Sequence, residues 1–391
     1  MLFQLTVYSL LFLINSLLCT ALLYDNPIVA AATYLSDYNY NYNYASDKPL
    51  SSNVSLMNTV DKSHSIADYD KMKKCNEDTS KMPTSIEYLT YFNCGHVELH
   101  KLPNGTQQVS REFTIIVKEN QSIPIANNGL VFDNAWTFNG TIPGPTMRVT
   151  EGDLVRINVI NSKENNHTHS LHLHSIHPAN MDGVDGPGGQ IKPGKNFTYS
   201  FVAQPFGIYP YHCHVMPIDQ HINNGLYGAI IIDPKTPRPA MKEMVMLMNG
   251  YDLDYEKEGA GPGRIPTPEE VKEDYMPQGF EHANEVYTVN GKAFDYVNNP
   301  IQLQKGVNYR IYLINMLEFD QVNSFHLHGN LFQYFPSGTS TKASYATDIL
   351  TLGQGDRGIV EFNYPYVGKY MFHSHINEFA DLGWMGYVDV N

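Results

Sequence analysis

The chain contains an internal repeat, and this repeat constrains the fold more than any other feature of the sequence. When the sequence is shifted by 154 positions, EGDLVRINVIN (151–161) aligns with KGVNYRIYLIN (305–315), and HSLHLH (169–174) aligns with NSFHLH (323–328). A second pair of segments, FGIYPYHCH (206–214) and VGKYMFHSH (367–375), aligns at a shift of 161. The repetition indicates two copies of one structural unit, and 391 residues suffice for two domains with their own cores.

The repeated segments have the pattern of short β-strands. From about residue 110, stretches rich in Val, Ile, Thr, Phe and Tyr, such as REFTIIVK and YGAIIID, alternate with Gly, Pro and Asn turns. This alternation predicts an all-β fold made of two tandem β-sandwiches. We place the first domain at 100–235 and the second at 236–391, and we expect 252–282 to be a surface excursion.

The N-terminal part of the chain differs from the rest. Residues 1–23 carry no charged side chain and are followed by VAAAT, which predicts a secretory signal peptide over 1–32. The first basic residue is Lys48, so an uncleaved N-terminal anchor is the alternative. Residues 33–99, which include YNYNYNY, are expected to form a low-complexity extension. In both cases the rest of the chain is expected outside the cytoplasm.

Charge and cysteine content narrow the function. The net charge of -14 argues against nucleic acid as a partner and favours a small molecule or a basic redox protein. Of the four cysteines, Cys19 lies in the leader, while Cys75 and Cys94 either pair or remain free thiols. Cys213 has no remaining partner and lies among histidines.

Twelve of the sixteen histidines fall within residues 167–177, 212–221 and 326–375. A cysteine thiolate with two histidines and a weak axial ligand is the constellation of a blue-copper site. The first copy offers His169, Cys213 and His221, with Leu226 or Met216 at the axial position. Leucine cannot coordinate, so an axial Leu226 would raise the reduction potential.

The tripeptide His212-Cys213-His214 can serve two metal centres at once. Successive side chains of a strand point to opposite faces, so the thiolate would face one way and both imidazoles the other. Three further H-x-H pairs place two imidazoles on one face in the same manner: His172/His174, His326/His328 and His373/His375. Eight imidazoles are too many for one metal ion and suit three.

The motifs HSLHLH, YHCHVMPIDQHINNGLYGAIIIDP, FHLHG, YMFHSHINEFADLGWMG and TFNGTIPGPTMRVTEGD resemble those of the two-domain multicopper oxidases, laccase-like relatives of copper nitrite reductase. The resemblance covers roughly 110–391. It implies cupredoxin-like Greek-key domains and four coppers per chain, which would couple oxidation of a small-molecule, metal-ion or protein reductant to reduction of dioxygen to water. Type 1 copper would be held by His169, Cys213 and His221, and a trinuclear type 2/type 3 cluster by His172, His174, His212, His214, His326, His328, His373 and His375.

The second copy has Asn323 in the place of His169 and Ser374 in the place of Cys213, so it cannot form a blue-copper site. Each domain would contribute half of the cluster, which must lie where a first domain meets a second. The resemblance implies a ring-shaped homotrimer with this contact between subunits; contact within one chain is the alternative that the sequence leaves open.

Electron and proton delivery have candidate residues as well. Cys213, His212 and His214 would connect the two copper centres, and the loop NMDGVDGPGG offers Asp182 and Asp185 as proton carriers. Further acidic candidates are Glu378 and Asp381. His167 and His177 flank the ligand set and are expected to be exposed or to support the ligands.

Two other functions remain open from the sequence. Copper nitrite reductase needs a catalytic aspartate in an H-x-x-D-x-H motif, and His172 occupies that position here. A non-catalytic exported electron carrier would need only the blue-copper site, which would leave eight histidines unexplained. The number of coppers per chain distinguishes a nitrite reductase from the oxidase. Oxygen uptake distinguishes the oxidase from a non-catalytic electron carrier.

Overall fold

The computed structural model describes residue 75 and residues 83–253, 255 and 283–391. The expected signal peptide or anchor over 1–32, most of the extension 33–99 and most of the excursion 252–282 lie outside the described residues. No helix in the described ranges is long and apolar enough to cross a membrane.

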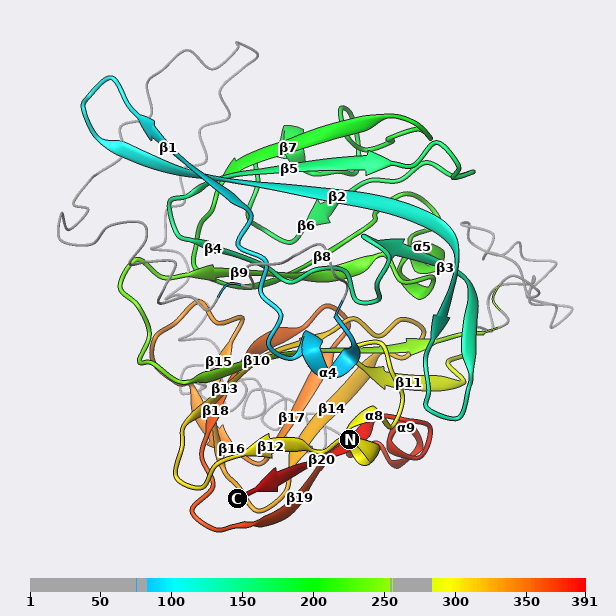
Figure 1. The fold of residues 1–391 in the computed structure, drawn as a ribbon, viewed down its shortest axis with the longest axis vertical. Coiled ribbons are helices and arrows are strands. Elements are labelled where there is room, and N and C mark those ends of the chain that lie inside the picture. Colours follow the sequence, from blue (N-terminus) through cyan, green and yellow to red (C-terminus); the bar gives the residue numbers. More distant parts are fainter. Residues whose placement is uncertain (1–74, 76–82, 254, 256–282) are drawn as a thin grey trace, which may run out of the picture. The chain divides into compact units, whose positions relative to one another are not determined.

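Two sheets form the first sandwich (Figure 1). One has the order β1-β2-β5-β7, with β3 also paired to β2, and consists of β1 (His96–Lys101), β2 (Gln107–Pro124), β3 (Val131–Phe138), β5 (Leu154–Asn161) and β7 (Asn196–Val202). The other has the order β4-β9-β8-β6 and consists of β4 (Met147–Thr150), β6 (His172–Leu173), β8 (Gly207–His212) and β9 (Tyr227–Asp233).

Two further sheets form the second sandwich, coloured yellow-green to red in Figure 1. The sheet β11-β10-β13-β18-β15-β16 consists of β10 (Lys242–Tyr251), β11 (Val286–Val289), β13 (Tyr309–Asn315), β15 (Phe332–Pro336), β16 (Tyr345–Thr347) and β18 (Arg357–Phe362). The sheet β12-β20-β19-β14-β17 consists of β12 (Ile301–Leu303), β14 (Val322–Leu327), β17 (Ile349–Gly353), β19 (Gly368–His373) and β20 (Met385–Val390).

Helices in the described ranges are short and lie outside the sheets. They are α4 (Ser85–Tyr88), the 3-10 helix η1 (Ala179–Met181), α5 (Ile218–Asn223), α8 (Asp295–Asn298) and α9 (Asn377–Asp381). In α4, Thr84 and Glu87 form a capping box, which satisfies two backbone N–H groups at the start of the helix.

The two sandwiches repeat one topology. The parallel pair β2/β5 corresponds to β10/β13, and the parallel pair β4/β9 corresponds to β12/β20. The antiparallel pair β6/β8 likewise corresponds to β14/β19. The predicted all-β fold of two tandem sandwiches is therefore confirmed.

Strand patterning explains where the cores lie. Along β2, Phe113, Ile115 and Val117 are buried while Glu112 and Thr114 are exposed, as expected for a strand with one face on a core. Strands β8 and β9 are instead buried along nearly their whole length. One face packs in the first core, and the other joins side chains of β10, β13 and β18 in a third apolar cluster between the sandwiches.

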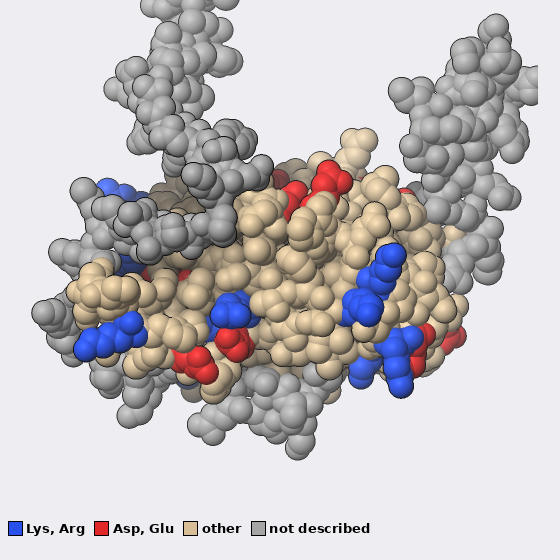
Figure 2. Space-filling model, turned by 90° about the horizontal axis from the view of Figure 1, so that it is seen from above, with Lys and Arg blue, Asp and Glu red and all other residues tan. Residues whose placement is uncertain are grey.

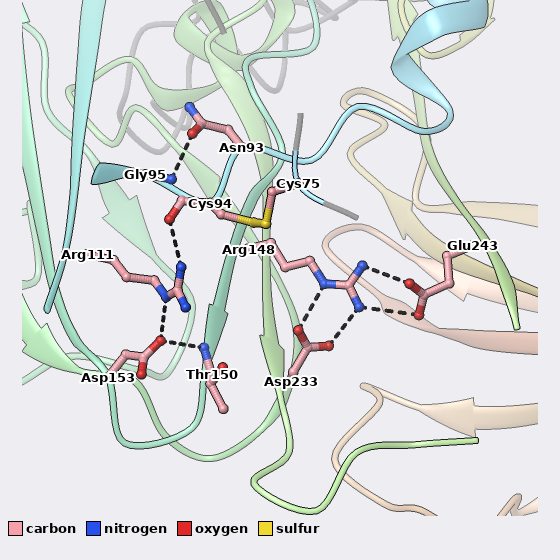
Figure 3. Close-up of a disulfide and its surroundings, with 10 residues drawn as sticks. All are labelled: Cys75, Asn93, Cys94, Gly95, Arg111, Arg148, Thr150, Asp153, Asp233 and Glu243. Atoms are coloured by element: carbon pink, nitrogen blue, oxygen red, sulfur yellow. Dashed lines mark hydrogen bonds and ion pairs between the residues drawn. A yellow bond between two sulfur atoms is a disulfide. The ribbon is translucent and has the colours of Figure 1, made fainter. Parts of the chain in front are cut away.

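The end of the N-terminal extension is built into the fold. Cys75 and Cys94 form a disulfide, shown in Figure 3. The carbonyl of Cys94 accepts a hydrogen bond from Arg111 Nη1 at 3.1 Å, and Arg111 Nε lies 2.6 Å from Asp153 Oδ2. Strand β1 begins at His96 and pairs with β2, so sheet structure starts a few residues before the predicted domain start at 100.

Figure 2 shows a largely uncharged face with separate groups of Lys and Arg side chains, several of them beside Asp and Glu side chains.

Candidate metal centres

The thiol of Cys213 lies in a buried group with two imidazoles. The ligand atoms of His169, Cys213 and His221 all lie within 4.8 Å of one another, and all three residues are buried. The distance from Cys213 Sγ to His169 Nδ1 is 3.9 Å, and the backbone N–H of Ser170 donates to Sγ at 3.3 Å. Cys213 forms no disulfide. The structure thus brings together the three residues predicted for the blue-copper site.

Three elements position this group. His169 precedes β6, Cys213 follows β8, and His221 lies in α5. The backbone of Leu226 is bonded to both Cys213 and His221. Its carbonyl accepts from Cys213 N at 3.0 Å, and its N–H donates to the His221 carbonyl at 3.0 Å. The Leu226 side chain is fully buried in the same apolar cluster as Cys213, whereas Met216 is 68% exposed. Of the two axial candidates, Leu226 is therefore the buried one, and its backbone is bonded to that of Cys213.

Burial favours the uncharged forms of the thiol and the imidazole in this group. Burial raises the pKa of the Cys213 thiol to about 11 and lowers the pKa of His221 to about 3. The Nδ1 atom of His221 is buried and has no hydrogen-bond partner among the described residues. A buried polar atom without a partner is costly unless something binds it. Copper prefers thiolate and imidazole ligands, so the residues present fit that metal.

Four further histidines of the first repeat gather on the other side of the thiol. His172 and His212 are direct cross-strand neighbours on β6 and β8. The ligand atoms of His172, His174 and His212 lie within 4.8 Å of one another, and the Nε2 atoms of His174 and His212 are 3.1 Å apart. The ring of His214 lies 5.0 Å from that of His172, and its buried Nδ1 has no partner in the described ranges.

Backbone carbonyls orient these rings. His172 Nδ1 donates to the carbonyl of Asp182 and His212 Nδ1 donates to the carbonyl of Cys213, both at 2.8 Å. A carbonyl can only accept, so each Nδ1 carries the proton and each Nε2 keeps its lone pair for a metal. Burial lowers the pKa of His174 to about 4 and of His212 to about 3, which favours the neutral, metal-binding form of both rings.

The second repeat builds the same arrangement. His326 and His373 are cross-strand neighbours on β14 and β19, and the Nε2 atoms of His328 and His373 are 3.1 Å apart. His326 Nδ1 donates to the carbonyl of Asp348 at 2.7 Å. The ring of His375 lies 5.4 Å from that of His326, and His375 is exposed. Each repeat thus brings together the four histidines that were predicted for its half of a cluster.

Asn323 and Ser374 occupy the place of the thiol group in the second repeat. Both are buried, and Ser374 Oγ donates to Asn323 Oδ1 at 3.1 Å. A satisfied polar pair therefore replaces a metal-ligand pair.

The two imidazole sets do not meet within one chain. Each group of possible ligands belongs to a single repeat, and in the described part of the chain every ring contact between these histidines stays inside its own repeat. The structure therefore does not support a cluster completed within one chain.

The acidic candidates have different surroundings. One carboxylate oxygen of Asp182 lies 3.2 Å from His172 Nδ1 and 3.5 Å from His177 Nε2. The side chain of His177 is only 8% exposed, so this residue supports the histidine set from inside rather than lying at the surface. Asp185 is exposed, and so are Glu378 and Asp381 on α9.

Two residues at the thiol group were not predicted from the sequence. The carboxylate of Glu119 lies 2.8 Å from His169 Nε2, and the indole of Trp136 packs edge-on against His169 and His221 with ring centroids 5.2 Å and 4.8 Å apart. The alternation of β2 contained a signal for the first: Glu119 continues the inward series of Phe113, Ile115 and Val117. A charged residue in an inward position needs buried partners.

Comparison with known proteins places this geometry in a family. Two family models, both described as multicopper oxidase, match residues 119–237 and 263–391. A solved structure described as a multicopper oxidase is 40% identical, with a TM-score of 0.67, and the match covers 82% of this chain and 99% of that one.

Curated relatives are more distant. A copper-containing nitrite reductase of Neisseria gonorrhoeae is 29% identical over 61% of this chain and 58% of its own length. Laccase-15 of Oryza sativa subsp. japonica is 26% identical over 69% of this chain and 45% of its own length. This chain thus spans less than two thirds of the curated relatives it matches. The family models and the solved structure nevertheless cover both sandwiches, and the chain belongs to the multicopper oxidases, a family of copper-dependent oxidoreductases.

Proposed function

We propose that this protein couples the one-electron oxidation of a reductant to the four-electron reduction of dioxygen to water. The observation that carries the proposal is the back-to-back placement of a buried thiol group and an imidazole set in the first repeat, with a matching imidazole set in the second. A thiolate site alone would suit electron transfer only, and imidazole sites alone would lack a route for electrons.

The proposed ligands follow the geometry. His169, Cys213 and His221 would hold type 1 copper, with Leu226 at the axial position. The trinuclear cluster would be held by His172, His174, His212, His214, His326, His328, His373 and His375. Bound copper would supply one-electron transfer at the first site and dioxygen reduction at the second.

The chain itself connects the two sites. Cys213 faces the buried thiol group, while its neighbours His212 and His214 face the imidazole set. The hydrogen bond from His212 Nδ1 to the Cys213 carbonyl adds a second connection beside the covalent one. The proposed electron route between the two sites therefore consists of His212, Cys213 and His214.

Protons would be supplied from the acidic loop after β6. Asp182 is the stronger candidate, because its carboxylate lies 3.2 Å from His172 Nδ1, and the exposed Asp185 would link it to solvent. The domains at 100–235 and 236–391 would each contribute half of the cluster. A homotrimer outside the cytoplasm, with dioxygen and a small-molecule, metal-ion or protein reductant as partners, fits this design and the expected leader.

A copper count combined with visible absorption tests the proposal. The loaded protein should hold four coppers per chain, show an intense blue absorption band and consume oxygen with a phenolic, Cu(I) or Fe(II) donor. Cys213→Ser should abolish the band and the oxygen uptake while keeping the cluster copper. Ser374→Ala changes the equivalent position of the second repeat and should keep the band. A loaded wild-type protein without a blue band would contradict the proposal.

Nitrite reduction is the second candidate, supported by the similarity to copper-containing nitrite reductases. That reaction would be indicated by two coppers per chain. His172 stands where that family has its catalytic aspartate, and its ring joins two other imidazoles, which favours the oxidase.

A non-catalytic exported copper protein is the third candidate. It would show the blue band but no oxygen consumption by fully loaded protein. The preformed imidazole sets of both repeats argue against it.

A further inference from the structure

The carboxylate of Glu119 is a buried charge at the thiol group. Its side chain is 1% exposed. Four N–H groups surround it: His169 Nε2 at 2.8 Å, and His167 Nδ1, the His167 backbone and the Asn166 backbone, each at 3.0 Å. Both carboxylate oxygens accept two hydrogen bonds, so the anion is fully satisfied without water.

These contacts keep the carboxylate ionised. Four N–H groups occupy both oxygens, and only an ionised carboxylate is an acceptor without an O–H of its own to place among these donors. A negative charge is thus present next to the His169 imidazole.

The carboxylate also decides which nitrogen of His169 is free. An anionic acceptor requires a proton on Nε2, so Nδ1 carries the lone pair and faces Cys213 Sγ at 3.9 Å. A carboxylate on the far nitrogen of a metal-binding histidine fixes the ring and makes the histidine a stronger donor.

The second repeat supplies an internal comparison. Asn161 and Asn315 are equivalent in the repeat, and their strand partners are Val117 and Met248. Two residues further along, Glu119 corresponds to Gly250. The repeat that has Asn323 and Ser374 in place of the metal-binding pair therefore lacks the carboxylate as well.

We propose that Glu119 positions His169 for copper and lowers the reduction potential of the type 1 site. The reason is electrostatic: a fixed negative charge favours the more positive, oxidised metal ion over the reduced one. This opposes the effect expected from the axial Leu226. The inference rests on the proposed type 1 site at His169, Cys213 and His221.

A substitution at His167 should shift the reduction potential in the direction opposite to Glu119→Gln. It is half-exposed, donates one of the four hydrogen bonds to Glu119, and its ring lies 4.7 Å from that of Trp136. His167→Phe removes the donor and keeps an aromatic ring on Trp136. The charge of Glu119 is then less compensated, so the potential should fall, whereas Glu119→Gln should raise it.

The experiment is a redox titration of the blue absorption band in the copper-loaded, full-length protein. Glu119→Gln should increase the equilibrium constant for reduction about tenfold, which is about 59 mV for one electron. Glu119→Asp keeps the charge and should stay nearer to wild type. Glu112→Gln, on the exposed face of the same strand, removes a charge paired with Arg156 at 3.3 Å and is the matched control without effect.

The outcomes separate this inference from the proposed function. A blue band with an unchanged or lowered potential in Glu119→Gln, or an equal rise in Glu112→Gln, would overturn the role of Glu119 while leaving the oxidase proposal intact. If Glu119→Gln fails to fold, an unchanged or raised reduction potential in His167→Phe would likewise overturn the role of Glu119. A wild-type protein without a blue band would remove both proposals together.

Discussion

At the scale of single residues, close packing at Gly225 supports the buried group that contains Cys213 and His221. Gly225 lies between His221 and Leu226 with a φ of 114°, in the left-handed region that favours glycine. A Cβ at this position would lie 2.1 Å from Ile142 Cδ1 and 2.7 Å from the Trp136 carbonyl. Small size and positive φ are therefore both required beside the predicted ligands.

Gly225→Ala should lower the free energy of unfolding by about 2–4 kcal/mol, because overpacking adds to backbone strain. It should also shift the blue band, since the turn that carries His221 must move. Gly105→Ala is the matched control: its φ is 81°, and a Cβ there has nothing within 4 Å. Strain alone should cost about 1 kcal/mol at that position. Equal losses for the two variants, measured by chemical denaturation, would show that packing at Gly225 is unimportant.

At the scale of elements, an ion cluster joins strands of the two sandwiches. Arg148 on β4 lies 2.9 Å from Asp233 at the end of β9 and 2.8 Å from Glu243 on β10, as Figure 3 shows. Arg310 on β13 contacts both Glu243 at 2.9 Å and Glu361 on β18 at 2.7 Å. Because these groups are buried, removing one of them leaves its partners without compensation.

The stability of the protein should therefore fall at acid pH. Burial alone would raise the pKa of Glu243, but Arg148 and Arg310 lower it from 4.5 to about 2. The unfolded chain then binds a proton more readily than the folded one. The stabilisation is present above pH 4.5 and is lost as the pH falls toward 2.

Comparison with Glu243→Gln isolates this contribution from other carboxylates. The variant should be less stable by about 3 kcal/mol at neutral pH, and the difference from wild type should shrink between pH 4.5 and pH 2. The free energy of unfolding, measured as a function of pH, checks this, with the exposed Glu112→Gln as control. A difference that stays constant with pH would mean that the charge of Glu243 is not what stabilises the contact.

At the scale of the whole molecule, each repeat of the chain carries its own set of imidazoles. His375 is exposed, and the two sets have no ring contact with each other in the described ranges. A closed ring of identical subunits would bring a first-repeat set of one chain to a second-repeat set of the next. This geometry is the physical reason for expecting a closed ring, and the resemblance to the two-domain multicopper oxidases implies three subunits in it.

Light scattering on the purified protein should therefore give the mass of three chains. Mixing two inactive variants gives a sharper test, since His174→Ala and His328→Ala damage different halves. Mixed trimers should regain part of the oxygen uptake, because some interfaces combine two intact halves. A monomer with full activity, or no recovery in verified mixed trimers, would contradict a cluster shared between subunits.

Much of the design was predictable from the sequence because it depends on local periodicity. The repeat is visible by aligning the sequence with itself, and the opposite facing of Cys213 and its neighbours follows from the two-residue period of a strand. That period places H-x-H pairs on one face before any tertiary contact is known. The structure confirms the fold class that this period predicted. Its histidine groups contain residues of the H-x-H pairs.

Other features depended on contacts between distant segments. Neither the pairing of Glu119 with His169, which are 50 residues apart, nor the burial of His177 has a local signature. The contrast between the buried Leu226 and the exposed Met216 also arises from tertiary packing. The sequence alone thus determined which side chains share a strand face, because pleating is a property of the local backbone. Only the tertiary structure decided which charges and apolar groups surround them, because those neighbours come from strands that meet only in the folded chain.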